Sequence, residues 1–339
     1  LSNQLIATDG TAVMGRVEVY DIANPSDPRR MGSGLLTKDG VPLRVKVAGR
    51  YAYVSTTNRG LQVVDLEKVV DPTHKIQMNH LDIHPTTGAH LGLAGAPGMP
   101  PTPGTTFHDD VVVAEYPMQD VPYDLVVGNE LLYVLTPANL FVYDISQSPN
   151  LRMVMAVSLK GGFRLAVATD TAYRNAKGED RRGDLAFVST GSAGEVQIYG
   201  GTATCEQTAL VGAVKCDAAG EGEIPSMKLL GRWNIGGTVS SMVVFAEKGV
   251  LVANRRMGSG VSESVILDMR EISNTPKELG VVSNGYSYTL VANESKTHFF
   301  MVSGSPGTSV ALDRWGTVTW QGADGEKVRG VVTDGVSRV

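Results

Sequence analysis

Short, valine-rich apolar runs, each bounded by Gly, Pro, Asn or Asp, recur along the whole chain. Runs of this length between turn residues are typical of β-strands rather than helices. No helical segment separates them, which disfavours a parallel α/β sheet, because parallel strands need long and usually helical crossovers. The pattern therefore predicts an all-β protein.

A unit of three short strands repeats along the chain. The segment from Val41 to Val54 aligns without a gap with the segment from Val121 to Val134, and each is followed by a further apolar run. Each unit ends in an aspartate after apolar residues, with 44 residues from Asp21 to Asp65 and 45 from Asp268 to Asp313. A period of about 40–45 residues with several strands is typical of a propeller blade. The sequence predicts a β-propeller of about six blades, with seven as the alternative, built from short antiparallel strands with long loop insertions.

The repeat also sets the expected boundaries. We expect the propeller over residues 1–330, with insertions at about 72–120, 169–183 and 200–226. Residues 331–339 read as a strand, a turn and the start of another strand. We expect them to begin a following segment of a longer chain, for which an immunoglobulin-like domain is the candidate.

The aspartates that end the units have a structural explanation. A carboxylate at the end of a strand accepts a hydrogen bond from the backbone N–H two residues on and so fixes a turn. Asn, Ser and Pro follow two of these aspartates, as such a turn requires. The expected structural turn residues are Asp21, Asp65, Asp144, Asp268 and Asp313.

The phrases VYDIANP at residues 19–25 and FVYDIS at residues 141–146 carry a resemblance to a known family. They are similar to the repeats of the LVIVD-repeat β-propeller family. The resemblance implies a prokaryotic propeller of secreted or cell-surface proteins, usually without an assigned reaction. It therefore implies an extracellular or periplasmic location for this chain.

The insertion at about 72–120 contains five of the six histidines. Imidazole is the commonest transition-metal ligand, and the spacing His80-x-Asp82-x-His84 places alternate side chains on one face of an extended segment. The candidate ligands are His80, Asp82, His84, His90 and His108, and the candidate metals are zinc, copper and calcium. No strict ligand spacing is matched, and the Pro/Gly-rich middle of the insertion favours a solvated loop, so we expect no cofactor.

The insertion at about 200–226 contains both cysteines of the chain, Cys205 and Cys216. Their spacing fits a disulfide that closes the loop, as in secreted proteins, while two unrelated free thiols are the alternative. A zinc site does not fit, because there is neither a Cys-x-x-Cys spacing nor a second pair.

The predicted central channel offers another candidate site. If the first strand of each unit lines the axis, the aligned residues are Arg44, Asp124, Arg164, Met242 and Tyr288. Guanidinium groups suit carboxylates and phosphates, so Arg44, Asp124, Arg164 and Tyr288 are candidates for binding an acidic ligand. The alternative is that these charges pair with one another and fill the channel.

Charge and missing motifs narrow the function. A net charge of −5 and a pI of about 5.7 argue against a nucleic-acid partner, and no apolar run approaches the length of a membrane helix. Phosphate-binding loops, dinucleotide fingerprints and serine nucleophile elbows are absent from the sequence. We predict a non-enzymatic binding or scaffold module that engages a protein, a polysaccharide or other domains of a longer chain through its faces and inserted loops. The alternative is a metal-dependent oxidase or hydrolase that uses the histidine-rich insertion.

Overall fold

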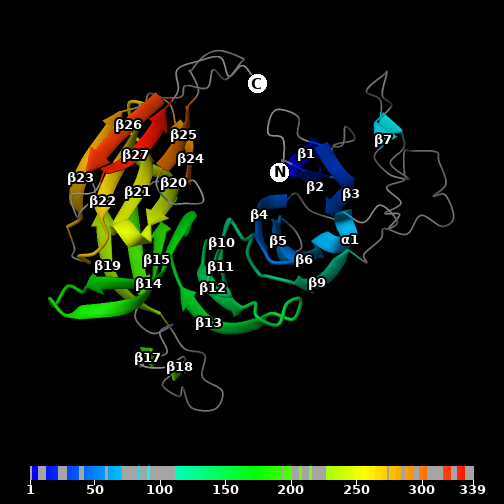
Figure 1. Cartoon of the computed structure of the whole chain (residues 1–339), viewed down its shortest axis with the longest axis horizontal. Helices are drawn as coiled ribbons and strands as arrows, with labels where there is room; N and C mark the ends of the chain where they lie inside the picture. The colour runs from blue at the N-terminus through cyan, green and yellow to red at the C-terminus, as the bar shows by residue number, and fades with distance from the viewer. Residues whose placement is uncertain are drawn as a thin grey trace. The chain divides into compact units, whose positions relative to one another are not determined.

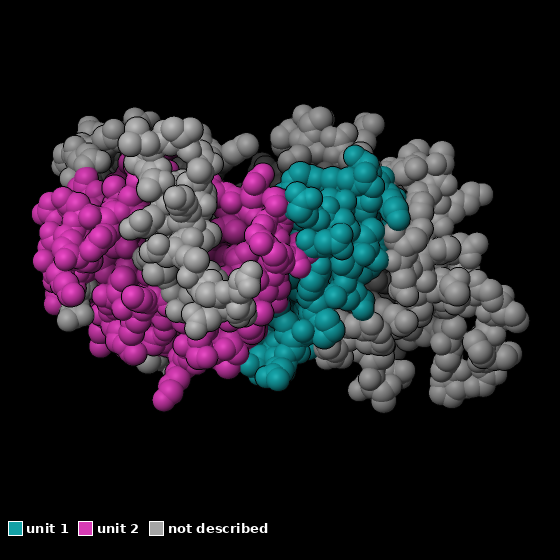
Figure 2. Space-filling view, turned by 90° about the horizontal axis from the view of Figure 1, so that it is seen from below, with its two compact units in different colours: residues 1–122, 147–150 teal, residues 123–146, 151–339 magenta. Residues whose placement is uncertain are grey.

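The computed structural model divides the chain into two compact units (Figure 2). Unit 1 comprises residues 1–122 and 147–150, and unit 2 comprises residues 123–146 and 151–339. The structure describes side chains for residues 42–57, 60–69, 111–191, 194–200, 227–272 and 275–281, with Leu290, Ala292 and Phe299. Elsewhere it describes only backbone, in strands and at the last residue of one helix.

Unit 1 contains two larger sheets. The first consists of β1 (Ser2–Ile6), β2 (Val13–Asp21) and β3 (Arg29–Thr37). The second consists of β4 (Pro42–Ala48), β5 (Tyr51–Thr56), β6 (Gly60–Asp65) and β9 (Val112–Tyr116). Between β6 and β9 lie α1 (Leu66–Val70) and a small pair, β7 (Asp82–Ile83) with β8 (His90–Leu91). The outermost strand β9 thus lies inside the segment expected to be an insertion.

Unit 2 contains four successive four-stranded sheets (Figure 1). The first is β10 (Asp124–Gly128), β11 (Leu131–Leu135), β12 (Asn139–Asp144) and β13 (Arg152–Ser158). The second is β14 (Arg164–Arg174), β15 (Asp180–Ser189), β16 (Glu195–Gly200) and β19 (Lys228–Asn234). The third is β20 (Thr238–Phe245), β21 (Val250–Arg256), β22 (Ser262–Asp268) and β23 (Lys277–Ser283).

The fourth sheet of unit 2 has a mixed topology. It contains, in spatial order, β24 (Ser287–Ala292), β25 (His298–Ser303), β27 (Lys327–Val332) and β26 (Gly316–Gln321). β25 and β27 are parallel, whereas the other pairs are antiparallel. β27 extends two residues past the boundary expected at residue 330, and residues 333–339 lie outside the described part. Two small elements complete the unit, the pair β17 (Glu206–Gln207) with β18 (Val214–Lys215) and the 3-10 helix η2 (Ala246–Lys248).

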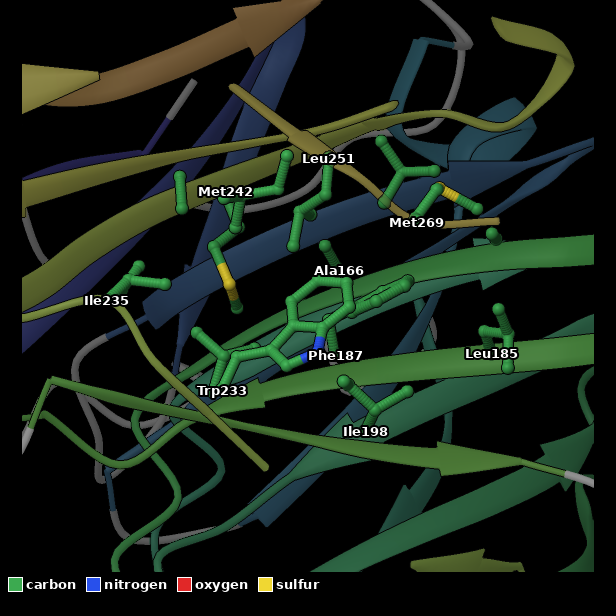
Figure 3. Packing of buried hydrophobic residues seen from close by; sticks show 14 of the residues in the cluster. Ala166, Leu185, Phe187, Ile198, Trp233, Ile235, Met242, Leu251 and Met269 are labelled. Atoms are coloured by element: carbon green, nitrogen blue, oxygen red, sulfur yellow. The ribbon is translucent and has the colours of Figure 1, made fainter. Parts of the chain in front are cut away.

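The blades of unit 2 pack face to face, and their innermost strands are neighbours. β10 contacts β14, β14 contacts β20, and β20 contacts β24. A hydrophobic cluster lies between each successive pair of sheets: Tyr133 with Val188, Trp233 with Leu251 (Figure 3), and Phe245 with Phe299. Antiparallel four-stranded sheets stacked around their innermost strands are propeller blades. The fold is an all-β propeller of about four to six blades, four of them regular antiparallel sheets.

This packing explains why the middle strands have no alternating pattern. β11 reads LLYVL with four of its five residues buried, and all of β6 is buried. A strand covered on both faces by neighbouring sheets needs apolar residues at successive positions. The outermost strands β13 and β19 instead mix exposed and buried residues, because they lie at the rim.

The outermost strand carries a β-bulge at the same place in four blades. The register shifts at Val63/Val64, Val142/Tyr143, Ile198/Tyr199 and Ile266/Leu267, just before the last two residues of the third strand. The extra residue of the outer strand is apolar and half-buried each time: Val113, Val154, Leu230 and Leu279. A bulge of this kind bends the strand and increases its twist.

Candidate functional site

The blades of unit 2 present two different faces. Three hydrogen bonds join the first halves or the middles of successive innermost strands: Leu165 N–H to Asp124 Oδ2 (3.0 Å), Arg164 Nε to the Ser240 carbonyl (2.8 Å) and Leu290 N–H to Ser241 Oγ (3.0 Å). The innermost strands therefore run in the same direction. All connections from a first to a second strand, and from a third to a fourth, emerge on one face, which we call the long-loop face. The other connections emerge on the short-loop face.

Charge and loop length separate these two faces. In the first three blades of unit 2, the connections on the short-loop face are residues 136–138, 159–163, 190–194, 235–237 and 257–261, and Lys160 is their one charged residue. On the long-loop face β16 ends at Gly200 and β19 begins at Lys228, and the tip of the β14–β15 hairpin lies on this face as well. Its shorter connections carry Glu130, Glu247, Lys248, Arg270 and Glu271. Polar loops held on a rigid scaffold are where binding residues concentrate.

The β14–β15 hairpin projects beyond its blade (Figure 1). β16 pairs with β15 only as far as Leu185, whereas β14 and β15 stay paired as far as Arg174 and Asp180. At the tip, Asn175 Oδ1 accepts the backbone N–H groups of Lys177 and Glu179, both at 3.0 Å. The segment expected as an insertion at 169–183 is therefore a structured hairpin, with its tip fixed by hydrogen bonds.

The third blade anchors the hairpin. Arg174 donates its backbone N–H to the Arg270 carbonyl (2.6 Å) and accepts the N–H of Ile272 at its own carbonyl (2.7 Å). The neighbouring Tyr173 is buried in the cluster between the second and third blades. The hairpin is thus an arm with a fixed direction, and a fixed arm loses little conformational entropy when it binds a partner.

Ion pairs cover the surface of the hairpin. Arg174 Nε lies 2.9 Å from Asp180 Oδ1, Arg181 lies 2.7 Å from Glu179, and Arg182 binds both carboxylate oxygens of Asp170. The Arg182 hydrogen bonds lower the pKa of Asp170, and the hydrogen bond from Asn175 is the main cause of the lowered pKa of Glu179. Exposed pairs of this kind contribute little to stability, so their groups can exchange partners readily.

A strained residue sets the direction of the hairpin. Asp170 has φ +47° at the bulge in β14, in the left-handed region that Asp tolerates better than most residues. Asp184 Oδ1 accepts the Asp170 N–H at 2.8 Å, and Asp184 Oδ2 accepts the hydroxyl of Tyr133 from the preceding blade. Burial, and then the charge of Asp184, raise the pKa of Tyr133 and keep its hydroxyl protonated as a donor. The preceding blade thus helps to hold the bulge in place.

The expected turn aspartates lie on the long-loop side of their blades. Backbone N–H groups two residues on bind Asp65 (from Glu67, 3.1 Å), Asp144 (from Ser146, 2.9 Å) and Asp268 (from Arg270, 3.0 Å). Each of these carboxylates also binds a basic side chain, Arg50, Arg152 and Lys277 respectively. Asp21 is the last residue of β2, and its side chain lies outside the described residues. Asp313 lies wholly outside them.

Sequence reasoning missed the basic partners of these aspartates. Asp21 with Arg29, Asp144 with Arg152, and Asp268 with Lys277 are Cα partners across the third and fourth strands. The basic residue follows its aspartate by eight, eight and nine positions. An Asp followed by Arg or Lys at this spacing is the signal that would have marked the start of β3, β13 and β23.

We expect the charge of Asp65 to make stability depend on pH. The hydrogen bonds from Arg50 lower the pKa of Asp65. A lowered folded pKa stabilises the protein above the ordinary carboxylate pKa of about 3.9, and this contribution is lost as the pH falls through the folded value. Asp65→Asn keeps an oxygen for the Glu67 N–H but removes the charge. In urea unfolding, the variant should be less stable than wild type at pH 7, and the gap should narrow at pH 3. An equal gap at both pH values would contradict this role.

The candidate channel residues lie in the innermost strands. Arg44 lies in β4 of unit 1, where its Nη1 donates to the Leu43 carbonyl at 2.8 Å. Asp124 is buried, and its two oxygens accept the N–H groups of Leu125 and Leu165. The Arg164 guanidinium lies 4.0 Å from the centre of the Phe163 ring. Tyr288 lies in β24, and its side chain is outside the described residues. Asp124, through the Leu165 N–H, and Arg164, through the Ser240 carbonyl, each join two neighbouring blades.

The candidate metal ligands and the cysteines fall mostly outside the described residues. His80, His84 and His108 are not described, and Asp82 and His90 are described only as backbone in the pair β7–β8. Among the side chains that the structure does describe, no three His, Cys, Asp or Glu residues gather into a metal-binding group. Cys205 and Cys216 also lie outside this part of the chain.

One family model identifies part of the chain. Residues 40–80 match the model of the LVIVD repeat. The chain carries an LVIVD repeat. This match confirms the resemblance expected from the sequence, and within the described residues the LVIVD repeat comprises β4, β5, β6 and α1. Asp65 and its partner Arg50 therefore belong to the LVIVD repeat.

The chain is similar to several solved structures at low identity. The WD40 domain of coronin from Toxoplasma gondii is 10% identical, with a TM-score of 0.48, and the match covers 99% of this chain and 79% of that one. A chain in the complex of KlAtg21 with the coiled coil of AgAtg16 is 12% identical, with a TM-score of 0.49 and coverage of 98% and 90%. A chain in the mitotic checkpoint complex is 10% identical, with a TM-score of 0.47 and coverage of 96% and 75%.

One further comparison and one observation on the helices concern the chain that carries the LVIVD repeat. No curated protein matches its sequence. Within the described ranges, no helix is long and apolar enough to cross a membrane.

Proposed function

We propose that the chain is a non-enzymatic binding or scaffold module of a secreted or cell-surface protein, and that it engages a protein partner through the long-loop face. The observation that carries this proposal is the difference between the two faces of unit 2. In the first three blades the short-loop connections hold one charged residue, Lys160, whereas the long-loop face holds the projecting hairpin and the ends of β16 and β19, which the cysteine-containing segment joins. In unit 1, the histidine-rich connection between β6 and β9 emerges at the corresponding end of its own blade.

The chemistry of the long-loop face supports binding more than catalysis. The aspartates at this end are occupied by backbone N–H groups and by basic side chains, which is a structural arrangement. The arginines of the hairpin are exposed, and the third blade holds the backbone that carries them. Arginine is enriched at protein interfaces, and a rigid presentation lowers the entropic cost of association.

A capture experiment with matched variants tests this proposal. The immobilised wild-type chain is incubated with surface and secreted proteins of the source cells, beside the triple variant Arg174→Glu/Lys177→Glu/Arg181→Glu and the short-loop variant Lys160→Glu. We expect a partner that binds wild type and Lys160→Glu equally and is lost from the triple variant. A partner lost from Lys160→Glu and retained by the triple variant would assign binding to the opposite face. No retained protein in any of the three samples would overturn the binding proposal.

Metal analysis tests the alternative enzyme directly. Elemental mass spectrometry of the purified chain should find well under one zinc, copper or calcium ion per chain, with no difference in the variant His80→Ala/His84→Ala. Near-stoichiometric metal that this variant loses would replace the proposal with a metal-dependent oxidase or hydrolase that uses the histidine-rich insertion.

We also propose that Cys205 and Cys216 form a disulfide. Support comes from the pair β17–β18, in which Glu206 and Lys215 are Cα partners, because each of these residues is the sequence neighbour of one cysteine. Closing a loop of this length restricts the unfolded chain and is worth about 2–3 kcal/mol.

The variant Cys205→Ser/Cys216→Ser should therefore unfold at a lower urea concentration than wild type, with a loss of about 2–3 kcal/mol. Intact mass after alkylation of the unreduced, denatured protein gives the direct measurement. We expect no alkylated thiol before reduction and two afterwards. Two alkylated thiols in the unreduced protein would rule the disulfide out.

A further inference from the structure

We propose that the outer edge of the β15 hairpin strand pairs with the same edge of a second copy of the chain, as a short antiparallel ladder. The edge consists of Asp180, Arg181 and Arg182, and we call it the hairpin edge. This inference does not depend on the proposed function, because the hairpin edge is one side of the arm and leaves its tip and the rest of the long-loop face accessible.

The direction of the backbone groups along the hairpin edge follows from the other side of the hairpin. Both the N–H and the C=O of Arg174 bond to the connection after β22, so they point away from β15. Arg174 and Asp180 are Cα partners. In an antiparallel pair, when the backbone groups of one residue point outward, those of its partner point outward on the opposite side. Asp180 therefore directs its N–H and C=O to the outer edge, and so does Arg182, two residues further on.

These outward groups lie on an exposed edge. β16 covers β15 only from Leu185 to Ser189. No strand in the described part of the chain pairs with the outer side of Asp180 or Arg182. Their side chains are 80% and 62% exposed. An exposed edge with unpaired backbone groups is a template for another strand.

The charges of the hairpin edge select a second copy as the occupant. In an antiparallel ladder centred on Arg181, Asp180 lies opposite Arg182 of the second copy, and Arg182 lies opposite its Asp180. Opposite charges placed directly across a strand pair stabilise the pairing, and like charges oppose it. The two-fold arrangement therefore gives two favourable cross-strand pairs from one sequence, as an isologous contact requires.

The remaining charges are compatible with this register. Arg181 lies opposite Arg181 of the second copy, on the face of the ladder away from Asp180 and Arg182. Each Arg181 guanidinium keeps its own Glu179 at 2.7 Å. The present partners of Asp180 and Arg182, which are Arg174 and Asp170, form exposed pairs that can be exchanged or shared. A ladder centred on Arg182 would instead place Asp180 opposite Asp184 of the second copy, and so would lose both opposite-charge pairs. Because the edge is short, we expect a weak and reversible dimer.

Sedimentation velocity over a wide concentration range tests this inference on the full chain. Wild type should shift reversibly from monomer to dimer as the concentration rises. Asp180→Arg and Arg182→Asp should each weaken the dimer by about tenfold or more, because each places like charges opposite one another. The double variant Asp180→Arg/Arg182→Asp restores opposite charges across the two-fold axis and should restore the dimer.

Lys177→Asp is the matched control, because it reverses an exposed charge at the tip of the same hairpin but away from the hairpin edge. It should dimerise like wild type, and circular dichroism should show that every variant is folded. Three outcomes would overturn the inference: a wild type that stays monomeric, a double variant that dimerises no better than the single variants, or a dimer that neither Asp180→Arg nor Arg182→Asp weakens. Loss of the dimer in Lys177→Asp would point to the tip instead.

Discussion

Replacing Trp233 with alanine should lower the free energy of unfolding by about 3–5 kcal/mol, the usual cost of deleting a large buried aromatic side chain. Trp233 is fully buried, and its ring centre lies 5.9 Å from that of Phe187. It belongs to the cluster that joins the second and third blades of unit 2 (Figure 3). Truncation would leave a cavity between two β-sheets whose paired backbones cannot collapse to fill it.

Urea unfolding followed by circular dichroism gives the measurement, since the substitution removes a fluorophore. Arg232→Ala is the matched control: the adjacent side chain is 54% exposed and loses only its ion pair with Glu195. Surface changes of this kind stay within about 0.5 kcal/mol. Trp233→Phe should recover most of the lost stability. If Trp233→Ala were as stable as Arg232→Ala, the packing described between these blades would be wrong.

Asp124→Ala should cost about 2–3 kcal/mol, because it leaves two backbone N–H groups without an acceptor. These groups belong to Leu125 in its own strand (3.1 Å) and to Leu165 in the next blade (3.0 Å). Both leucines are buried, so water does not readily replace the carboxylate. Hydrogen exchange should report the same loss locally, with faster exchange at the Leu165 amide.

The control for this prediction is Glu130→Ala. Glu130 is exposed and lies at the other end of the same blade, so its removal should leave both stability and exchange close to wild type. Asp124→Asn keeps one carbonyl oxygen and should fall between wild type and Asp124→Ala. Equal stability of Asp124→Ala and Glu130→Ala would show that the link between the two blades contributes nothing.

The repeat in the sequence accounts for much of the fold. The gapless alignment of residues 41–54 with 121–134 corresponds to β4–β5 and β10–β11, which have the same strand order and are each joined by a two-residue turn. The expected aspartates are the last residues of β2, β6, β12 and β22. They can be found from the sequence because a side-chain carboxylate and its N–H donor lie only two residues apart. Local chemistry of this kind is readable from one chain.

Contacts between distant residues were not readable in this way. β9 was expected to be part of a loop, because its five residues are separated from β6 by a long insertion and carry no mark of their partner. The acceptor role of Asp124 depends on a backbone N–H 41 residues away, and every residue except proline has such a donor. The segment at 169–183 was expected to be a charged insertion with an exposed hairpin tip, but its anchor is a backbone contact to Arg270 and Ile272, which the sequence does not reveal.

The bulge shared by four outermost strands should reduce aggregation through the edges of the blades. Each blade ends in a strand that could add a strand from another molecule, and flat, regular edges of this kind start ordered aggregates. The bulges at Val113, Val154, Leu230 and Leu279 twist these rims and interrupt their hydrogen-bonding rows. We therefore expect the rims of these four blades to resist strand addition when molecules crowd together.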